Sequence, residues 1–340
     1  MDETRSRRPT MKDVAALAGV SLSTVSRTVN GDSAVRPDLA AKVQHAVELL
    51  GYQRDEAASA LRRTGRVSAS IGIIVEDVAN PFFSLVHRGV EDCARERRFL
   101  TFAGSSDDDD QRERDLAAAF VARRVDGLLI APAGRDHRYL ERERAAGVPL
   151  VFVDRPARWL EADAVVSDNH GGSATAVTHL VAAGHRRIAF LGDRPELFTT
   201  TERLAGYRTG LEASGIAYDD ALVRVGLDEL AAHAAALELL DLPEPPTALF
   251  SAQNFVSIGV LRALHERGAR ESIGHVGFDD VALSDLLAPA LTVIAQDPYE
   301  LGRAAAEVLF ERLDGDTSPP RRVVLAARLV PRGSGEIPPP

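Results

Sequence analysis

The sequence contains a single cysteine, Cys93. One thiol cannot form a disulfide within the chain, and it cannot supply a thiolate metal cluster. The N-terminal segment MDETRSRRPT also lacks the apolar run of a secretion signal or a membrane anchor. We therefore expect a protein of the reducing cytoplasm with no membrane attachment.

The phosphate loops and nucleophile elbows of common α/β enzymes are missing from the sequence. Gly171-Gly172 is followed by SAT, which fits neither G-x-G-x-x-G nor G-x-x-x-x-G-K-[ST], and no G-x-S-x-G occurs. The histidines show no H-E-x-x-H spacing. The acidic run at 107–110 could be interpreted as a cation site. Because it lies between an expected strand and an expected helix, we interpret it as a solvated acidic loop. We expect no catalytic residue, no metal and no cofactor.

The composition is that of a folded protein with an uneven charge. The 340 residues suit two or three domains, and 45% of them are hydrophobic. Residues 1–66 contain eleven Lys/Arg and eight Asp/Glu, a surplus of three positive charges, so the net charge of −10 leaves −13 for the remainder. Such asymmetry indicates a nucleic-acid-binding module joined to an acidic domain.

Short apolar runs alternate with amphipathic stretches after a basic, polar linker at 61–70. Runs too short for a helix predict strands at 71–75, 127–130, 149–153, 188–191, 248–250 and 291–294. Helical patterns occupy 111–124, 169–183, 202–214 and 298–313, and Gly147 and Gly184 follow helical segments as stop signals. This alternation predicts βαβ units with parallel sheets covered by helices on both faces.

The N-terminal segment at 11–29 carries two short helical patterns on either side of Gly19. Gly19 allows a sharp turn, and Ala15 lets the helices approach closely. Ser21 is a candidate cap of the second helix. The apolar contacts between the helices are expected from Val14, Val20, Val25 and Val29, and the exposed face from Leu22, Ser23, Ser26 and Arg27.

A third helix is expected from Pro37 to Leu50, ending before Gly51. Its buried residues should be Leu39, Val43, Ala46 and Leu50. Three helices then close a small helix-turn-helix core, although the spacing of the first two alone also fits an ordinary helical hairpin.

These motifs resemble the lactose-repressor (LacI-type) family. The resemblance rests on KDVAALAGVSLSTVSRTVN at 12–30, VQHAVELLGY at 43–52, NPFF at 80–83, VDGL at 125–128, VSDN at 166–169, RLAGY at 203–207, GFDD at 277–280 and LTVIAQD at 291–297. It implies an N-terminal three-helix helix-turn-helix DNA-binding domain at 1–54, a hinge helix and linker at 55–69, and a short tail at 334–340.

The residues between them, 70–333, should form an α/β periplasmic-binding-protein-like domain of two doubly wound subdomains. The resemblance places the first at about 70–166 and 297–326 and the second at about 167–295 and 327–333. The three crossovers should fall near 166–168, 295–297 and 325–329, with a ligand bound between the subdomains.

The resemblance also assigns DNA contacts. Leu22 and Ser23 lie where the family selects its operator, and Arg27 lies at a base-contacting position, where its guanidinium matches guanine bidentately. Ser21, Thr24 and Asn30 are expected on phosphates. The DNA-binding set is completed by Ser26, Tyr52, Ala58 and Leu61.

The hinge at 55–62 departs from the family pattern. Leu61 occupies the position of a leucine that wedges between minor-groove base steps, although it would also suit a plain linker. Arg54-Asp55 replaces the usual Pro-Asn, so the backbone is freer, and Asp55 and Glu56 repel nearby phosphates. We therefore expect the hinge to depend more strongly on DNA.

For the effector, the resemblance indicates Phe82, Phe83, Asp154, Arg203, Gln253 and Asp279. Carboxylates accept hydroxyl protons, a guanidinium donates from a planar fork, and aromatic faces pack on sugar C–H groups. Each also has a plain structural alternative. The phenylalanines suit a core, Arg203 a solvated ion pair, Asp279 a cap and Asp154 a strand end, while Asp168 and Asn169 suit the crossover itself.

The sequence thus predicts a transcriptional regulator, a repressor, that binds a pseudo-palindromic operator in double-stranded DNA as a homodimer and responds to a sugar or sugar derivative. An α/β enzyme is the first alternative, disfavoured by the missing motifs. A transport solute-binding protein is the second, and it would need a leader and no helix-turn-helix. The segment at 331–340 contains no leucine heptads, so a dimer is expected rather than a coiled-coil tetramer.

Overall fold

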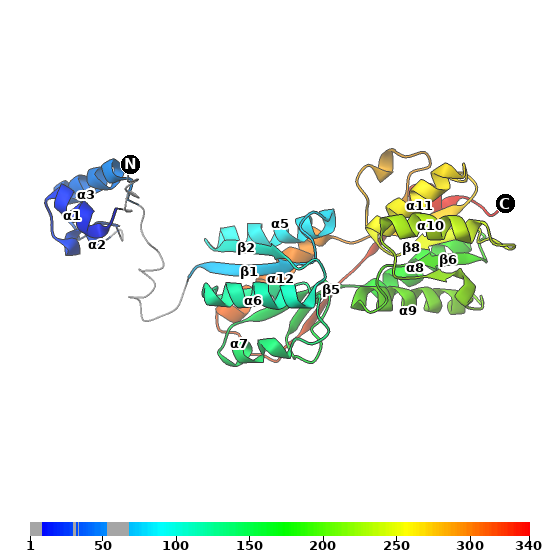
Figure 1. Cartoon of the computed structure of the whole chain (residues 1–340), viewed down its shortest axis with the longest axis horizontal. Coiled ribbons are helices and arrows are strands. Elements are labelled where there is room, and N and C mark those ends of the chain that lie inside the picture. Colours follow the sequence, from blue (N-terminus) through cyan, green and yellow to red (C-terminus); the bar gives the residue numbers. More distant parts are fainter. Residues whose placement is uncertain (1–8, 30–31, 33, 53–67) are drawn as a thin grey trace, which may run out of the picture. The chain divides into compact units, whose positions relative to one another are not determined.

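The computed structural model describes residues 9–29, 32, 34–52 and 68–340 (Figure 1). The chain divides into two compact units, Met1–Ser68 and Ala69–Pro340. The hinge at 55–62, with Ala58 and Leu61, and the phosphate-contact candidate Asn30 lie outside the described residues. No helix in the described part of the chain is long and apolar enough to span a membrane.

The first unit has the expected three helices, α1 (Met11–Ala18), α2 (Leu22–Val29) and α3 (Pro37–Leu50). Gly19 ends α1 with φ +64°, a left-handed conformation that glycine adopts without strain. Val14, Val25, Val43 and Ala46 form the core together with the Tyr52 ring. The expectation for Leu39 was wrong, because it lies half-buried in the first turn of α3 outside this core.

The second unit contains two sheets, and we call each sheet with its helices a lobe. The first lobe has strands β1 (Ser70–Val75), β2 (Leu100–Ser105), β3 (Gly127–Ile130), β4 (Leu150–Val153), β5 (Asp163–Ser167) and β11 (Arg322–Leu325) in the order β11-β5-β4-β3-β1-β2. Its paired strands are parallel. Helices α5 (Pro81–Glu96) and α12 (Pro298–Leu313) cover one face, and α6 (Asp110–Ala122) and η1 (Arg138–Leu140) lie over the other, with the short α7 (Glu141–Ala145) following η1.

The second lobe repeats this plan. Its strands β6 (Ile188–Leu191), β7 (Val223–Arg224), β8 (Ala248–Ser251), β9 (Gly274–Phe278), β10 (Thr292–Ala295) and β12 (Arg328–Val330) have the order β12-β10-β9-β8-β6-β7, with β12 antiparallel to β10. Helices α8 (Asn169–Ala182) and α9 (Phe198–Ala213) pack on one face, and α10 (Glu229–Leu240) and α11 (Asn254–Glu266) pack on the other (Figure 1).

Both sheets are doubly wound. Strand order reverses between β1 and β3 in the first lobe and between β6 and β8 in the second. Loops at such a switch point diverge to opposite faces and leave a crevice at the carboxyl ends of the strands. The described chain passes from one sheet to the other after β5, after β10 and after β11, where the family resemblance implies crossovers.

Two segments differ from expectation. Helix α9 begins at Phe198 rather than Glu202, although it opens on threonines, which are poor helix formers. The Thr201 hydroxyl donates to Leu197 O at 2.9 Å, in addition to the helical bond from Thr201 N to the same carbonyl at 3.0 Å. Residues 334–337, expected as part of a tail, pack on the second lobe: Ser334 is buried, and its hydroxyl donates to His275 O at 2.6 Å.

The contact between α5 and α12 gives a stability prediction. A Cβ added to Gly302 of α12 would overlap the carbonyl oxygen of Val86 in α5. Gly302→Ala should therefore lower the free energy of unfolding by about 1–3 kcal/mol, as overpacking does, measured by urea denaturation. Ala118→Ser, on the exposed side of α6, is the control and should stay within about 0.5 kcal/mol. Equal stability of Gly302→Ala and the parent protein would contradict the tight helix contact.

Candidate functional site

A small polar cavity lies at the carboxyl ends of the strands of both lobes. Its volume is about 30 Å³. The six effector residues suggested by the sequence all line it, namely Phe82, Phe83, Asp154, Arg203, Gln253 and Asp279. The lining also includes residues that sequence reasoning missed, namely Glu76, Asn80, Arg155, Asp193, Thr199, Asn254 and Gln296. The fold thus brings loops and helix starts from distant parts of the chain around one space.

Strand ends explain this convergence. Glu76 directly follows β1, Asp154 follows β4, Asp279 follows β9 and Gln296 follows β10. Parallel strands of a sheet end at the same edge, so the side chains just after them lie close together. Asp154 and Asp279 have φ of +70° and +73°, a region that non-glycine residues seldom adopt. Backbone strain of this kind is concentrated at functional sites.

Arg203 is held firmly on α9 and is not a solvated helix residue. Its Nε donates to Asn169 Oδ1 at 2.7 Å, and its Nη1 donates to Ala252 O at 2.8 Å. Nη1 lies 3.8 Å from Asp279 Oδ2, and the guanidinium stacks 3.9 Å from the centre of the Phe278 ring. Asn169 therefore orients Arg203 in addition to opening α8.

Arg155 is the second buried guanidinium of the cavity. It is 5% exposed. Its Nη1 donates to Asp108 at 3.0 Å and to Pro132 O at 3.1 Å, and its Nη2 donates to Glu76. Arg155 thus joins the loops that follow β1, β2, β3 and β4. Asp108 belongs to the acidic run at 107–110, so that loop is tied into the cavity wall.

The carboxylates of the cavity are destabilised as anions by burial. Burial raises the pKa of Asp154, Asp193 and Asp279, only partly offset by nearby arginines. The pKa of Glu76 rises to about 7, because burial and the charge of Asp108 outweigh the Arg155 guanidinium. Such groups gain from any ligand that donates hydrogen bonds to them.

The apolar and amide members of the lining have distinct surroundings. Phe83 is 3% exposed and belongs to the core of the first lobe, whereas Phe82 is half-buried and meets the Phe83 ring edge-on with centres 5.1 Å apart. Gln253 Oε1 accepts from Val256 N at 3.0 Å, so Gln253 caps α11. Phe82 therefore has the more accessible aromatic surface of the two.

Direct polar contacts join the lobes next to the cavity. Asn254 Nδ2 donates to Asn80 Oδ1 at 2.8 Å. Arg194 Nη1 donates to Asp108 O at 3.3 Å, and Arg158 Nη2 donates to Glu196 O at 2.8 Å. The two sides of the cavity are thus connected by hydrogen bonds and by the ion pair of Arg194 with Asp108 at 3.5 Å, as well as by the crossovers.

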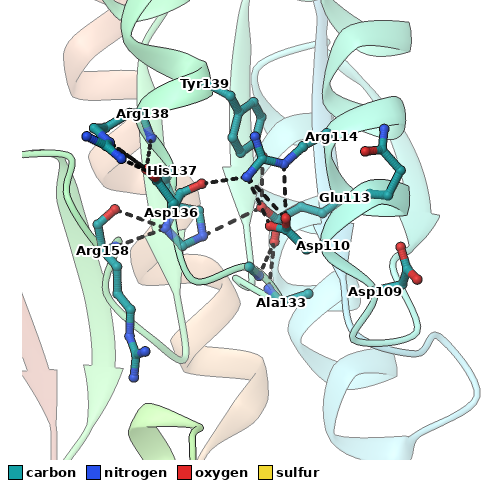
Figure 2. A network of polar contacts seen from close by, with 12 residues as sticks. Asp109, Asp110, Glu113, Arg114, Ala133, Asp136, His137, Arg138, Tyr139 and Arg158 are labelled. Carbon is teal, nitrogen blue, oxygen red and sulfur yellow. Dashed lines mark hydrogen bonds and ion pairs between the residues drawn. The ribbon is translucent and has the colours of Figure 1, made fainter.

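A buried network in the first lobe supports one of these contacts (Figure 2). Glu113 accepts from Ala133 N at 2.6 Å and from the Tyr139 hydroxyl at 2.8 Å, and its Oε1 lies 3.5 Å from His137 Nε2. His137 Nδ1 accepts from Arg158 N at 2.9 Å, and burial lowers the pKa of His137. Because Nδ1 accepts, a neutral His137 carries its proton on Nε2, an atom that has no hydrogen-bond partner in the described part of the chain. The network fixes the backbone of Arg158, whose side chain reaches the second lobe.

The helical unit presents the expected face of α2. Ser21 caps the helix, because its Oγ accepts from Thr24 N at 3.1 Å, while Leu22, Ser23 and Arg27 are exposed and Ser26 is half-buried. Tyr52, named among the DNA-contacting residues, is 9% exposed because its ring packs in the helical core.

Arg27 is paired within its own unit. Its Nε donates to Asp32 at 2.8 Å, and this hydrogen bond lowers the pKa of Asp32. Asp32 also accepts from Ala34 N at 2.9 Å through its other oxygen. Nε must therefore leave Asp32 before it can bind another acceptor, whereas this bond does not use the two terminal nitrogens of the guanidinium.

The raised pKa of Glu76 predicts a pH-dependent stability. The folded state holds a proton on Glu76 up to about pH 7, whereas the unfolded chain releases it near its ordinary pKa of 4.5. The contribution of protonated Glu76 to the free energy of unfolding is therefore complete at low pH, and it is lost as the pH rises through 7. Between about pH 5.5 and pH 8, the wild type should lose roughly 1–3 kcal/mol of unfolding free energy relative to Glu76→Gln.

Urea denaturation at several pH values measures this difference. Glu238→Gln removes an exposed carboxylate of α10 and should keep the pH dependence of the wild type. Identical slopes for Glu76→Gln and the wild type would show that Glu76 titrates normally.

Comparisons with known proteins agree with this two-part architecture. Residues 10–55 match the bacterial regulatory proteins of the lacI family, and residues 177–335 match the periplasmic binding protein-like domain. The lac repressor dimer bound to operator and the anti-inducer ONPF superposes with a TM-score of 0.85 at 26% identity, covering 97% of this chain and 99% of that chain. The CelR–cellobiose complex gives a TM-score of 0.72 at 33% identity, covering 96% and 100%.

Sequence relatives extend over the whole chain. The ribose operon repressor of Escherichia coli K12 is 33% identical over 331 residues, 96% of this chain and 99% of the relative. The transcriptional regulator CelR of Thermobifida fusca is 36% identical over 339 residues, 97% of this chain and 99% of the relative. With both the helical unit and the two-lobed unit accounted for at this level of identity, the chain belongs to the lacI family of bacterial regulatory proteins.

Proposed function

We propose that this protein is a transcriptional repressor whose affinity for operator DNA is controlled by a small hydroxyl-rich metabolite, a sugar or sugar derivative. The observation that carries the proposal is the presence, in one chain, of an exposed α2 face and a polar cavity at the strand ends of two mostly parallel sheets. An enzyme is disfavoured, because the relatives that span this chain are regulators.

The DNA-reading role falls to α2. Arg27 would donate to guanine O6 and N7 in the major groove, Leu22 would contact a thymine methyl, and Ser23 and Ser26 would reach base edges. Ser21 and Thr24 would hold phosphates and so set the register. Leu22 supports this assignment, because its side chain is 42% exposed in the free protein and burying it against DNA would be favourable.

The ligand role falls to the cavity. Asp154 and Asp279 would accept hydrogen bonds from hydroxyl groups, and Arg203 would donate to ring or hydroxyl oxygens. Gln253 would offer its amide, and Phe82 would pack on C–H groups. A cellobiose complex of CelR and a ribose complex of a family member from Enterococcus faecium share this fold and support a carbohydrate ligand.

The protein would act as a homodimer on a pseudo-palindromic operator in the cytoplasm, by analogy with the operator-bound lac repressor dimer. We further propose that the two subdomains comprise about 70–166 with 297–326, and about 167–295 with 327–333. A ligand that binds one arrangement of the subdomains more tightly than the other would shift the population of DNA-binding dimers.

Separate arginines should separate the two functions. Arg27→Ala should reduce operator affinity by about ten- to a hundredfold, because a bidentate base contact provides about 1–3 kcal/mol of discrimination, and it should leave ligand binding unchanged. Arg203→Ala should abolish ligand binding and the ligand response while operator binding persists. Fluorescence anisotropy with the upstream DNA of the protein's own gene and calorimetry with ribose and cellobiose measure the two. Equal loss of both functions in either variant would contradict the division.

Asp32 gives a second test of the role of Arg27. Asp32→Asn keeps an acceptor for Ala34 N but frees the Arg27 charge, so operator affinity should rise several-fold, with a salt dependence steeper by roughly one ion. Asp38→Asn is the matched control, because Asp38 is an exposed carboxylate of the same unit that pairs with Arg36 instead. If both variants raise affinity equally, the effect is one of net charge and not of Arg27.

A further inference from the structure

Carboxylates outnumber guanidiniums around the cavity. Among the described residues that line it, Glu76, Asp154, Asp193 and Asp279 are acidic, and Arg155 and Arg203 are basic. These carboxylates also lie close enough to repel one another: Asp193 and Asp279 raise the pKa of Asp154, and Asp108 and Asp193 raise that of Glu76. The cavity therefore carries a surplus of negative charge when its acids are ionised.

Both arginines are already paired with acceptors of the protein. Arg155 binds Glu76, Asp108 and Pro132 O and lies 3.2 Å from Asp154 through Nε. Arg203 binds Asn169 and Ala252 O and lies 3.8 Å from Asp279. A phosphate or carboxylate that approached either guanidinium would have to displace a carboxylate or enter beside it.

The lining has open acceptors, and its buried donor without a hydrogen-bond partner among the described residues, Arg155 Nε, lies 3.2 Å from Asp154 Oδ2. Asp193 accepts from the Thr200 hydroxyl through Oδ1, and no donor of the described residues reaches its Oδ2. Gln296 donates to Asp279, and its own Oε1 is buried without a partner in the described part of the chain. Buried acceptors gain most from a ligand that brings donors, above all charged donors.

We propose that the cavity selects its ligand by charge: it binds hydroxylated ligands in the order ammonium-bearing, neutral, anionic, with Glu76 and Asp193 as the specificity-determining residues. This inference rests on the proposed function, in which a hydroxyl-rich metabolite occupies the cavity. Amino sugars and amino polyols are the class that fits best. Phosphorylated sugars and sugar acids are rejected, because their charge adds to that of the carboxylates.

An ammonium group supplies what the site lacks. It brings three donors and a positive charge, so it satisfies the open acceptors and removes the repulsion among the carboxylates. A neutral hydroxyl supplies a donor without the charge, and an anion supplies neither. Close charge pairs in desolvated sites couple strongly enough for about tenfold or more in affinity.

The test uses the full chain and matched sugars. Calorimetry and thermal shift compare glucose, glucosamine, glucose 6-phosphate and glucuronate, and then ribose with ribose 5-phosphate. We expect glucosamine to bind at least about tenfold more tightly than glucose, and no binding of the phosphates or the uronate. Equal affinity for glucose and glucosamine, or an anionic sugar that binds more tightly than its neutral parent, overturns the proposal.

Variants locate the effect. Asp193→Asn keeps the acceptor for Thr200, and Glu76→Gln keeps an acceptor for Arg155, so each removes charge with little change of shape. Each should reduce the preference for glucosamine over glucose to near unity, whereas Glu238→Gln, an exposed change outside the cavity lining, should retain it. An undiminished preference in both cavity variants overturns the assignment.

A probe independent of sugar identity separates this inference from the proposed function. Tris(hydroxymethyl)aminomethane is a small protonated amine with hydroxyl groups, and sodium phosphate at equal ionic strength is its anionic counterpart. The amine should raise the melting temperature of the wild type more than that of Asp193→Asn, and phosphate should not. If the amine raises the melting temperature in this way while none of the sugars binds, the charge selection is supported and a sugar effector is disfavoured. An equal response of the wild type and both cavity variants to the amine overturns the proposal even then.

Discussion

Two guanidinium groups buried at the ends of the parallel strands hold the described cavity together. A buried guanidinium is tolerated only when its donors are satisfied, and loss of one partner leaves an uncompensated charge. Arg155 draws in the loops after β1, β2, β3 and β4, and Arg203 draws in the start of α8 and the segments that follow β8 and β9. The positions of Glu76, Asp154 and Asp279 in the wall therefore follow from the need to surround these two charges.

The contacts between the two lobes are weaker than the bonds that these guanidinium groups make within the cavity wall. The direct contacts described between them are few, and they include the hydrogen bonds from Asn254 to Asn80 and from Arg158 to Glu196 O and the ion pairs of Arg194 with Asp108 and Arg135 with Glu196, each at 3.5 Å. A bond of this kind contributes only about 1 kcal/mol net. A ligand that bonds to Asp154 on one lobe and Arg203 on the other gains a free energy comparable to that of these contacts. Its binding can therefore favour one of two arrangements of the lobes.

Local patterns were sufficient to predict most of the fold. Short apolar runs gave six of the twelve described strands, namely β1, β3, β4, β6, β8 and β10, because a buried parallel strand has apolar residues on both faces. Gly19 gave the turn between α1 and α2. Of the cavity, the family resemblance yielded six residues, although it passed over Asn80 and Gln296, which lie in the motifs NPFF and LTVIAQD. It missed Arg155, Glu76 and Asp193, because a charged residue after a strand reads as a solvated loop. Their meaning depends on partners far away: Arg155 pairs with residues 47 and 79 positions distant.

Burial also hid two other features. Glu113 lies in the string DQRERDL, which reads as an exposed helical face, yet it is fully buried against the loop after β3. Tyr52 reads as a surface residue after a helix, yet the left-handed Gly51 turns the chain so that the ring closes the helical core. Neither could be predicted from periodicity, since each depends on what a second segment places beside it.

The charge distribution finally bears on how a regulator of this kind finds one site among many. The acidic surplus lies entirely in residues 67–340, so attraction to phosphates is confined to the helical unit. Within that unit Arg27 is already bonded to Asp32. A single phosphate oxygen offers little more than this carboxylate does, whereas guanine offers two acceptors in the geometry of the guanidinium fork. If Arg27 reads a guanine as proposed, Asp32 weakens its attraction to non-specific DNA more than to the operator, and the pair raises specificity at the expense of affinity.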